Sequence, residues 1–119
     1  MKPYMIDHID NYAGARIRTC SSSAYKRLMT ASEAEDMTEL LTGVVEYGTG
    51  YVLNTDAYSV AGKTGTAEYN SEGESHSWFV GFSNVENPDI VVCVVIEEAD
   101  ISGVRAVNVA KQIFDAYYQ

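Results

Sequence analysis

Positively charged residues are scarce in this 119-residue chain, which has 8 Lys and Arg against 17 Asp and Glu and a formal net charge of −9. Nucleic acids and anionic membranes attract proteins through clustered Lys and Arg, so this balance argues against both as partners. The scarcity is greatest between Leu28 and Val104, where fourteen acidic residues accompany a single Lys or Arg, Lys63. A lone cation in such a segment is a candidate for a functional charge.

Cysteines and long apolar runs are also few. The two cysteines, Cys20 and Cys93, make no disulfide framework, although pairing between them stays open. We expect Cys93 to be a small buried side chain, because it lies in the apolar run Ile90–Ile96. That run is too short to cross a bilayer, and acidic residues interrupt any signal-peptide pattern at the start, so no membrane segment or export signal is expected here. His8 and His76 are far apart in the sequence, and no spacing implies a metal or an organic cofactor.

The 46% hydrophobic content predicts a folded core, and the length predicts one domain over residues 1–119 with no internal boundary. At the start, Tyr4–Asp10 and Arg16–Thr19 flank the turn-forming segment Asn11–Gly14. This pattern predicts an N-terminal β-hairpin.

A helix is predicted next, because two overlapping capping boxes, Thr30 with Glu33 and Ser32 with Glu35, mark its start. Gly48 or Gly50 can end it. Its apolar positions fall at helical spacing: Met37, Leu40, Leu41, Val44 and Val45.

The second half predicts three strands and a closing helix. A strand around Lys63 is followed by Ser77–Ser83 and Asp89–Ile96, with a turn between the last two. Trp78 and Phe82 are expected to lie in the core. Ser102 can cap the closing helix, whose apolar side carries Val104, Val107, Ala110, Phe114 and Tyr117. The fold class is therefore α+β: an antiparallel sheet formed by the Lys63, Trp78 and Ile90 strands, with the hairpin and packing helices.

The lone cation opens a Lys63-Thr64-Gly65 (KTG) motif, which is followed by Thr66. Upstream lies Gly48-Thr49-Gly50, and downstream lies the apolar strand Trp78–Phe82. This arrangement resembles the C-terminal part of the penicillin-binding protein transpeptidase domain, most strongly from Met37 to Ile96. The resemblance implies that the KTG strand is the edge of an antiparallel sheet and forms one wall of an active site.

Each residue of the motif then has an expected role. The resemblance implies that Lys63 supplies positive potential and hydrogen bonds, and that Thr64 and Thr66 bind the terminal carboxylate of the substrate. The backbone N–H of Thr66 matches the family's oxyanion donor. Gly65 has no Cβ, so an extended peptide can approach the strand closely. The alternative is a solvated strand end in which Lys63 pairs with a neighbour such as Glu68.

Two motifs of the family are missing from the sequence. No Ser-x-Asn triplet occurs, and in the one Ser-x-x-Lys pattern, Ser23 to Lys26, only 36 residues separate Lys26 from Lys63. We therefore interpret the chain as a C-terminal piece of a D,D-transpeptidase, cut before the catalytic serine and inactive alone. Its implied partners are D-Ala-D-Ala stem peptides and β-lactams, and its implied location is the extracytoplasmic face of the bacterial membrane.

Two alternatives remain: a non-catalytic β-lactam sensor or interaction module of the same fold, and a self-contained serine acyl enzyme that uses Ser23 and Lys26. If the chain lacks the helices that cover the sheet in this family, apolar surface is left exposed, and we expect self-association.

Overall fold

The computed structural model describes residues 2–119, which form two compact units, residues 2–33 and residues 34–119. The expectation of a chain without an internal boundary stays a prediction.

The first unit contains the predicted hairpin. Strands β1 (His8–Asp10) and β2 (Arg16–Thr19) pair in antiparallel fashion. In the turn, the Asn11 side chain accepts hydrogen bonds from the backbone N–H groups of Ala13 and Ala15, both at 2.9 Å. Gly14 adopts a φ of +77°, which a residue without a Cβ reaches at little cost. Local turn chemistry therefore forms this hairpin, with a first strand shorter than the sequence suggested.

Helix α1 (Ala31–Glu46) starts and ends where the sequence predicts. At its start the Thr30 N–H donates to the Glu33 carboxylate at 2.7 Å, and the Glu33 N–H donates to the Thr30 hydroxyl at 3.2 Å. The hydrogen bonds that Thr30 donates to the Glu33 carboxylate, from its N–H and from its hydroxyl, lower the pKa of Glu33, and the backbone N–H is the main cause. At the end, the N–H groups of Gly48 and Gly50 both donate to the carbonyl of Val44, at 3.2 and 3.0 Å.

The apolar side of α1 is buried only towards its C-terminal end. Val45 is 3% exposed, whereas Met37 and Leu40 are 47% and 69% exposed. The periodicity thus predicted the helix correctly but did not show how much of its apolar side is covered.

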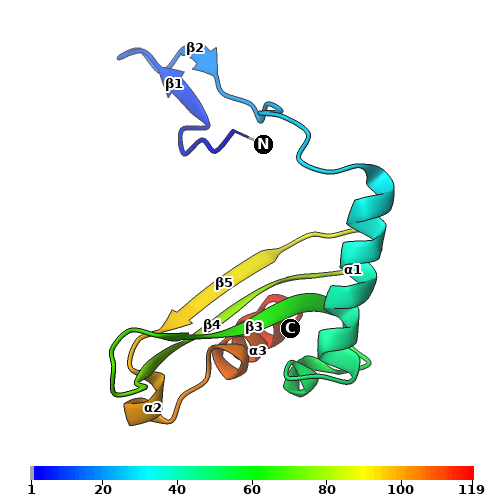
Figure 1. Cartoon of the computed structure of the whole chain (residues 1–119). Helices are drawn as coiled ribbons and strands as arrows, with labels where there is room; N and C mark the ends of the chain where they lie inside the picture. Colours follow the sequence, from blue (N-terminus) through cyan, green and yellow to red (C-terminus); the bar gives the residue numbers. More distant parts are fainter. Residues whose placement is uncertain (1) are drawn as a thin grey trace. The chain divides into compact units, whose positions relative to one another are not determined.

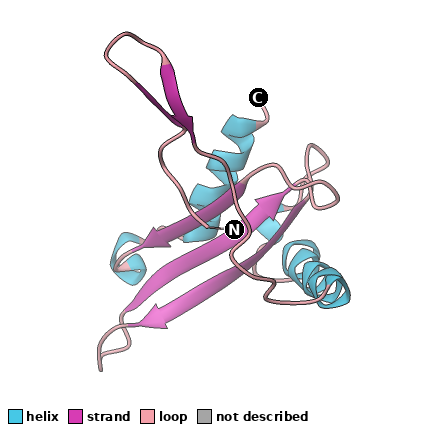
Figure 2. Ribbon diagram, turned by 90° about the horizontal axis from the view of Figure 1, so that it is seen from above, coloured by secondary structure: helices cyan, strands magenta, loops and turns pink. Residues whose placement is uncertain are grey.

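Three strands form the central sheet in the order β3-β4-β5: β3 (Val60–Glu68), β4 (Ser75–Ser83) and β5 (Val91–Ile96). All neighbours are antiparallel, as predicted. Figures 1 and 2 show the strands side by side, with α3 (Ala106–Tyr117) along one face. A 3-10 turn (Tyr51–Leu53) precedes the sheet, and a short helix, α2 (Ala99–Ser102), precedes α3.

The core lies between α3 and the sheet, and Phe79 is at its centre. Its side chain is fully buried. The ring fills the space over two paired glycines, because a Cβ built on Gly62 or Gly81 would lie 2.7 Å from Phe79 Cζ. The surrounding buried side chains are Val45, Leu53, Tyr58, Val60, Val92, Val94, Ala106, Ala110 and Phe114.

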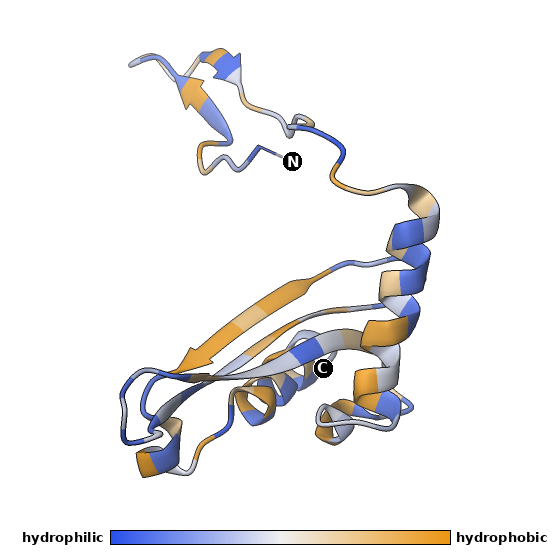
Figure 3. Ribbon diagram, viewed as in Figure 1, coloured by the Kyte–Doolittle hydropathy of each residue, from blue (hydrophilic) through white to orange (hydrophobic). Residues whose placement is uncertain are grey.

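The other face of the sheet is apolar and exposed, and the predictions that Trp78 and Cys93 are buried are wrong. Trp78 is 42% exposed, Val80 is 49% exposed and Cys93 is exposed, whereas Phe82 is partly buried. The register explains this, since Trp78, Val80 and Phe82 alternate with the face that packs on α3. Figure 3 shows β5 as a mainly hydrophobic strand. Cys20 and Cys93 are both free thiols.

The closing helix starts later than predicted, and Ser102 does not cap it. Ser102 ends α2, and Gly103 follows with a φ of +66° that breaks the helix. The first N–H of α3, on Ala106, donates instead to the hydroxyl of Ser77 in β4 at 3.0 Å. Val104 thus lies before the helix.

Candidate functional site

The KTG motif lies on β3, which is an edge strand of the three-stranded sheet. Lys63 pairs with Val80 and Gly65 with Trp78, so both lie on the exposed face. Thr64 and Thr66 lie on the opposite face, which packs against α3. Alternation along the strand therefore separates the ammonium group of Lys63 from the two hydroxyl groups, as the period of two predicts.

The backbone N–H and C=O groups of Thr64 and Thr66 point towards the open edge of β3. In an antiparallel pair, hydrogen-bonded and non-hydrogen-bonded residue pairs alternate. The Tyr69 N–H donates to the Glu74 carbonyl at 3.1 Å, and the register runs unbroken from there through the motif. Odd-numbered residues of β3 therefore bond to β4, and even-numbered residues point their N–H and C=O groups away from it. The N–H of Thr66 is thus available at the edge, as an oxyanion donor or a peptide-binding strand requires.

Lys63 reaches this edge although its Cβ lies on the other face. Its Nζ donates to the carbonyl oxygen of Thr64 at 2.5 Å. In the part of the chain that the structure describes, Lys63 forms no ion pair, so Glu68 is not its partner. The ammonium group is exposed and remains able to bind an anionic or hydroxyl group at the edge.

The turn after α1 contributes a further residue, Thr49, which the sequence analysis noted only as part of a Gly-Thr-Gly triplet. Its hydroxyl lies 2.5 Å from the hydroxyl of Thr64. The flanking glycines allow the tight turn after α1, because a Cβ on Gly48 would lie 2.9 Å from the Val44 carbonyl oxygen and one on Gly50 would lie 3.1 Å from it. The triplet therefore holds a hydroxyl group against the KTG strand.

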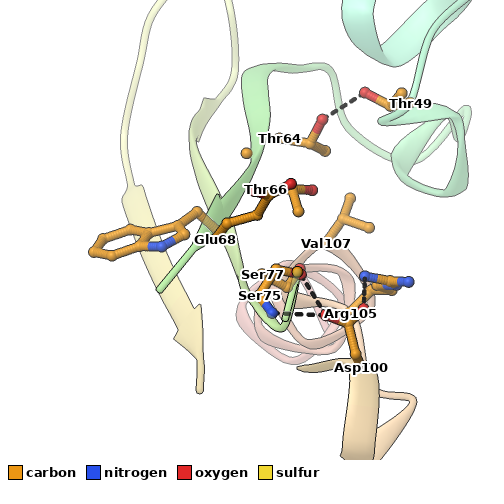
Figure 4. Close-up of a pocket in the computed structure, with 12 residues that line it drawn as sticks. Thr49, Thr64, Thr66, Glu68, Ser75, Ser77, Asp100, Arg105 and Val107 are labelled. Carbon is orange, nitrogen blue, oxygen red and sulfur yellow. Dashed lines mark hydrogen bonds and ion pairs between the residues drawn. The ribbon is translucent and has the colours of Figure 1, made fainter. Parts of the chain in front are cut away.

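A pocket of about 470 Å³ opens beside these hydroxyl groups. Thr49, Thr64 and Thr66 line one part of it, and Asp100 and Arg105 line another (Figure 4). Sequence reasoning missed Asp100 and Arg105, because they follow β5 and reach the site only through the packing of α2 and α3. Other lining residues are Gly65, Glu68, Gly73, Ser75, Ser77, Trp78 and Val107.

Asp100 is held in place at this pocket. One carboxylate oxygen accepts hydrogen bonds from the N–H and the hydroxyl of Ser75, at 2.7 and 2.6 Å. The other lies 3.8 Å from Nη1 of Arg105. The Ser75 hydroxyl is the main cause that lowers the pKa of Asp100, so the carboxylate is ionised at neutral pH.

The alternative nucleophile lies in the first unit and lacks helical geometry. Ser23 forms an isolated β-bridge with Lys2, whose N–H donates to the Ser23 carbonyl at 2.8 Å. Lys26 lies in irregular structure before α1. A Ser-x-x-Lys pair needs one helical turn to bring the lysine beside the serine, and these residues do not form that turn.

Within residues 2–119, no group of three or more His, Cys, Asp and Glu side chains is placed to hold a metal ion. None of the helices in that range is both long enough and apolar enough to cross a membrane.

An antiparallel sheet with a KTG edge strand and a packed closing helix defines a transpeptidase-like fold, and comparison with known proteins agrees. The family model described as the penicillin binding protein transpeptidase domain matches residues 1–118. The chain belongs to this family. The match covers the whole three-stranded sheet and the helices α1, α2 and α3.

Individual relatives support the assignment. The chain is 36% identical over 93 residues to a peptidoglycan D,D-transpeptidase MrdA from Acinetobacter baumannii, covering 66% of this chain and 14% of that protein. It is 35% identical over 91 residues to penicillin-binding protein 2a from Streptococcus pneumoniae, which covers 75% of this chain and 12% of that protein. The chain thus spans about an eighth of the length of these relatives.

Solved structures share the fold. The D,D-transpeptidase domain of a peptidoglycan glycosyltransferase from Eggerthella lenta has a TM-score of 0.75 at 36% identity, covering 89% of this chain and 24% of that one. Penicillin-binding protein A from Mycobacterium tuberculosis, in an imipenem acyl-enzyme complex, has a TM-score of 0.81 at 24% identity. The similarity covers 98% of this chain and 26% of that one. The second similarity bears on the fold alone.

Proposed function

We propose that this chain is the C-terminal part of a peptidoglycan D,D-transpeptidase domain and forms the KTG wall of its active site. The observation that carries this proposal is the open edge of β3. There the N–H of Thr66 is unpaired with β4, the Lys63 ammonium group is close by, and Thr64 and Thr66 present hydroxyl groups to the pocket. An extended peptide can add to such an edge as a further strand.

The reaction that this wall would serve is acyl transfer. A serine hydroxyl attacks the carbonyl carbon of the D-Ala-D-Ala peptide bond, an ester forms, and the terminal D-Ala leaves with the proton on its amine. An amine of a second stem peptide then attacks the ester, forms the new amide and returns a proton to the serine oxygen. A β-lactam acylates the same serine by opening its ring.

Within this scheme the residues of β3 have separate tasks. The N–H of Thr66 stabilises the negative charge that develops on the carbonyl oxygen, a contribution of about 10²–10³ in rate for one donor. The hydroxyl groups of Thr64 and Thr66 bind the terminal carboxylate. Lys63 supplies positive potential at the edge, and Gly65 leaves room for the peptide.

The nucleophile is supplied by sequence outside these 119 residues, and the chain alone is inactive. The exposed face that carries Trp78, Val80 and Cys93 supports this proposal, because an apolar sheet face of a finished domain is normally covered. We infer that the remainder of the same domain covers it. The complete protein would act on peptidoglycan at the extracytoplasmic face of the membrane.

The test compares the purified chain with the product of the full gene that encodes it, both treated with a fluorescent penicillin. We expect covalent label on a serine outside residues 1–119 in the longer product and none on the chain. Label that is retained by the chain and lost in Ser23→Ala would overturn the fragment proposal. A longer product that takes up no label would favour the non-catalytic module.

A further inference from the structure

The short helix α2 lies in a connector, residues 97–105, that begins where β5 ends and leads into α3. Two contacts fasten this connector to the start of β4. Asp100 accepts hydrogen bonds from the N–H and the hydroxyl of Ser75. The N–H of Ala106, the residue after the connector, donates to the hydroxyl of Ser77. Because Asp100 and Arg105 line the pocket, the connector forms part of the pocket wall (Figure 4).

His76, which lies between these two serines in β4, supplies a third contact. Its Nδ1 accepts a hydrogen bond from the N–H of Glu98 at 3.1 Å. The ring of Tyr69 stacks on the imidazole, with centroids 4.5 Å apart and planes 14° apart, so the imidazole is held in one orientation. Glu98 has a φ of +49°, a left-handed conformation that a residue with a Cβ adopts rarely. His76 therefore holds the connector where its backbone is least favourable.

The connector depends on such contacts because α2 has only four residues. Helices this short do not persist by themselves in water. The N–H groups of Ser102 and Gly103 close this helix, and they donate to the carbonyls of Glu98 and Ala99 at 3.2 and 2.9 Å. These two N–H groups should therefore exchange with solvent more easily whenever the attachment to β4 is weakened.

We propose that His76 is a pH-dependent latch for this connector: the neutral ring holds the Glu98 N–H, and protonation of the ring releases it. An imidazole nitrogen accepts a hydrogen bond only while it carries no proton, and both nitrogens of the charged ring are donors. Histidine is the side chain whose charge ordinarily changes between about pH 5 and 8. The latch acts on the fold, so it does not depend on which ligand the pocket binds.

Other charged groups surround the ring, and they come from the β3–β4 turn and the connector: Glu74, Glu97, Glu98, Asp100 and the single cation Arg105. The acidic side chains favour a positive charge on the ring, and Arg105 opposes it. Burial is the main cause that raises the pKa of Tyr69 to about 12, and the Ser75 hydroxyl is the main cause that lowers the pKa of Asp100. Tyr69 and Asp100 therefore keep their charge states on mild acidification.

Release should loosen the connector without detaching it. Asp100 stays bonded to Ser75, and Ala106 stays bonded to Ser77, so only the end at Glu98 comes free. The loss of one neutral hydrogen bond corresponds to a change of about three- to tenfold in the population of the open connector. The pocket wall that carries Asp100 thus becomes more mobile at lower pH.

The test measures amide hydrogen exchange by NMR in the 119-residue chain at about pH 7.5 and about pH 5.5. Protection factors, which correct for the intrinsic effect of pH on exchange, are compared for Ser102 and Gly103. In the wild type we expect them to fall about three- to tenfold at the lower pH. The amide of Val94, which pairs with Phe79 in the sheet, should keep its protection.

Two variants separate the latch from the stacking on Tyr69. The side-chain oxygen of asparagine can accept the Glu98 N–H and does not titrate, so His76→Asn should keep the protection at both pH values. His76→Phe keeps a ring on Tyr69 but has no acceptor, so it should show the lower protection at both. His8→Asn is the matched control, because His8 lies in the first unit and pairs with acidic residues there. It should leave the pH response of the connector unchanged.

Several results would overturn the latch. One is a wild-type connector that is equally protected, or equally unprotected, at both pH values. A second is a His76→Asn variant that responds to pH as the wild type does. Wild-type protection in His76→Phe at the higher pH would show that the bond to Glu98 does not hold the connector. A parallel loss of protection at Val94 would mean that the whole sheet unfolds, which also contradicts a local release.

Discussion

Gly62, the residue before the KTG motif, should not tolerate even one added methyl group. A Cβ at this position would lie 2.7 Å from Cζ of Phe79 and 2.9 Å from the Val80 carbonyl oxygen, closer than Cβ atoms pack in proteins. Phe79 cannot move aside easily, because its side chain is fully buried in the core between α3 and the sheet. We therefore expect Gly62→Ala to strain the core directly beneath the motif.

The magnitude follows from overpacking. One extra carbon in a well-packed core costs about 1–3 kcal/mol, and the backbone carbonyl adds a contact that cannot relax by rotation. We expect Gly62→Ala to lower the free energy of unfolding by about 2 kcal/mol in urea titrations. The control is Gly43→Ala in α1, where the new methyl group would meet nothing within 4 Å. That change should stabilise the helix by up to about 1 kcal/mol.

A double mutant links the effect to Phe79. Combining Gly62→Ala with Phe79→Leu should cost less than the sum of the two single changes, because the smaller side chain gives up the space that the methyl group needs. A Gly62→Ala variant no less stable than Gly43→Ala would refute the packing argument, and strictly additive losses would refute the role of Phe79.

Three further outcomes follow from the same geometry. Thr66→Pro removes an N–H that points away from β4, so in urea it should cost about 1–3 kcal/mol less than Ala67→Pro, which removes a ladder donor; equal losses would contradict the edge register. Hydrogen bonds from Tyr118, Ser75 and Tyr58 are the main causes that lower the pKa values of Asp89, Asp100 and Asp115. These carboxylates favour the folded state at neutral pH, so the free energy of unfolding should fall as the pH drops below about 5, and less steeply in Asp100→Asn. Finally, the exposed apolar face predicts self-association of the isolated chain, and light scattering that shows a monomer at high concentration would contradict this.

Local signals in the sequence were sufficient for most of the secondary structure, but not for α2 or for the start of α3. The hairpin, α1 and the three strands depend on turn residues, caps and periodicity that act within a few positions. The face of β4 was not predictable in the same way, because Trp78, Phe79 and Val80 are consecutive apolar residues and give no alternation. Only the packing of α3 on Phe79 decides that Trp78 is exposed.

For the site too, the local motifs were predictable from the sequence, whereas the contacts between distant positions were not. The KTG motif and the Gly-Thr-Gly triplet were evident in the sequence. The cap of α3 was not, because the hydroxyl of Ser77 lies 29 positions before the N–H that it binds. Arg105 was missed for a similar reason, since folding alone brings the start of α3 to the end of β3.

The central claim is that the edge of β3 at Thr66 is open and receives the peptide, and amide hydrogen exchange measured by NMR tests it most directly. In the free chain the N–H of Thr66 should exchange much faster than those of Gly65 and Ala67, which bond to β4. Saturating acetyl-D-Ala-D-Ala should slow the exchange of Thr66 and leave its two neighbours unchanged. A Thr66 amide that is already protected in the free chain, or one that the peptide does not affect, would contradict the account.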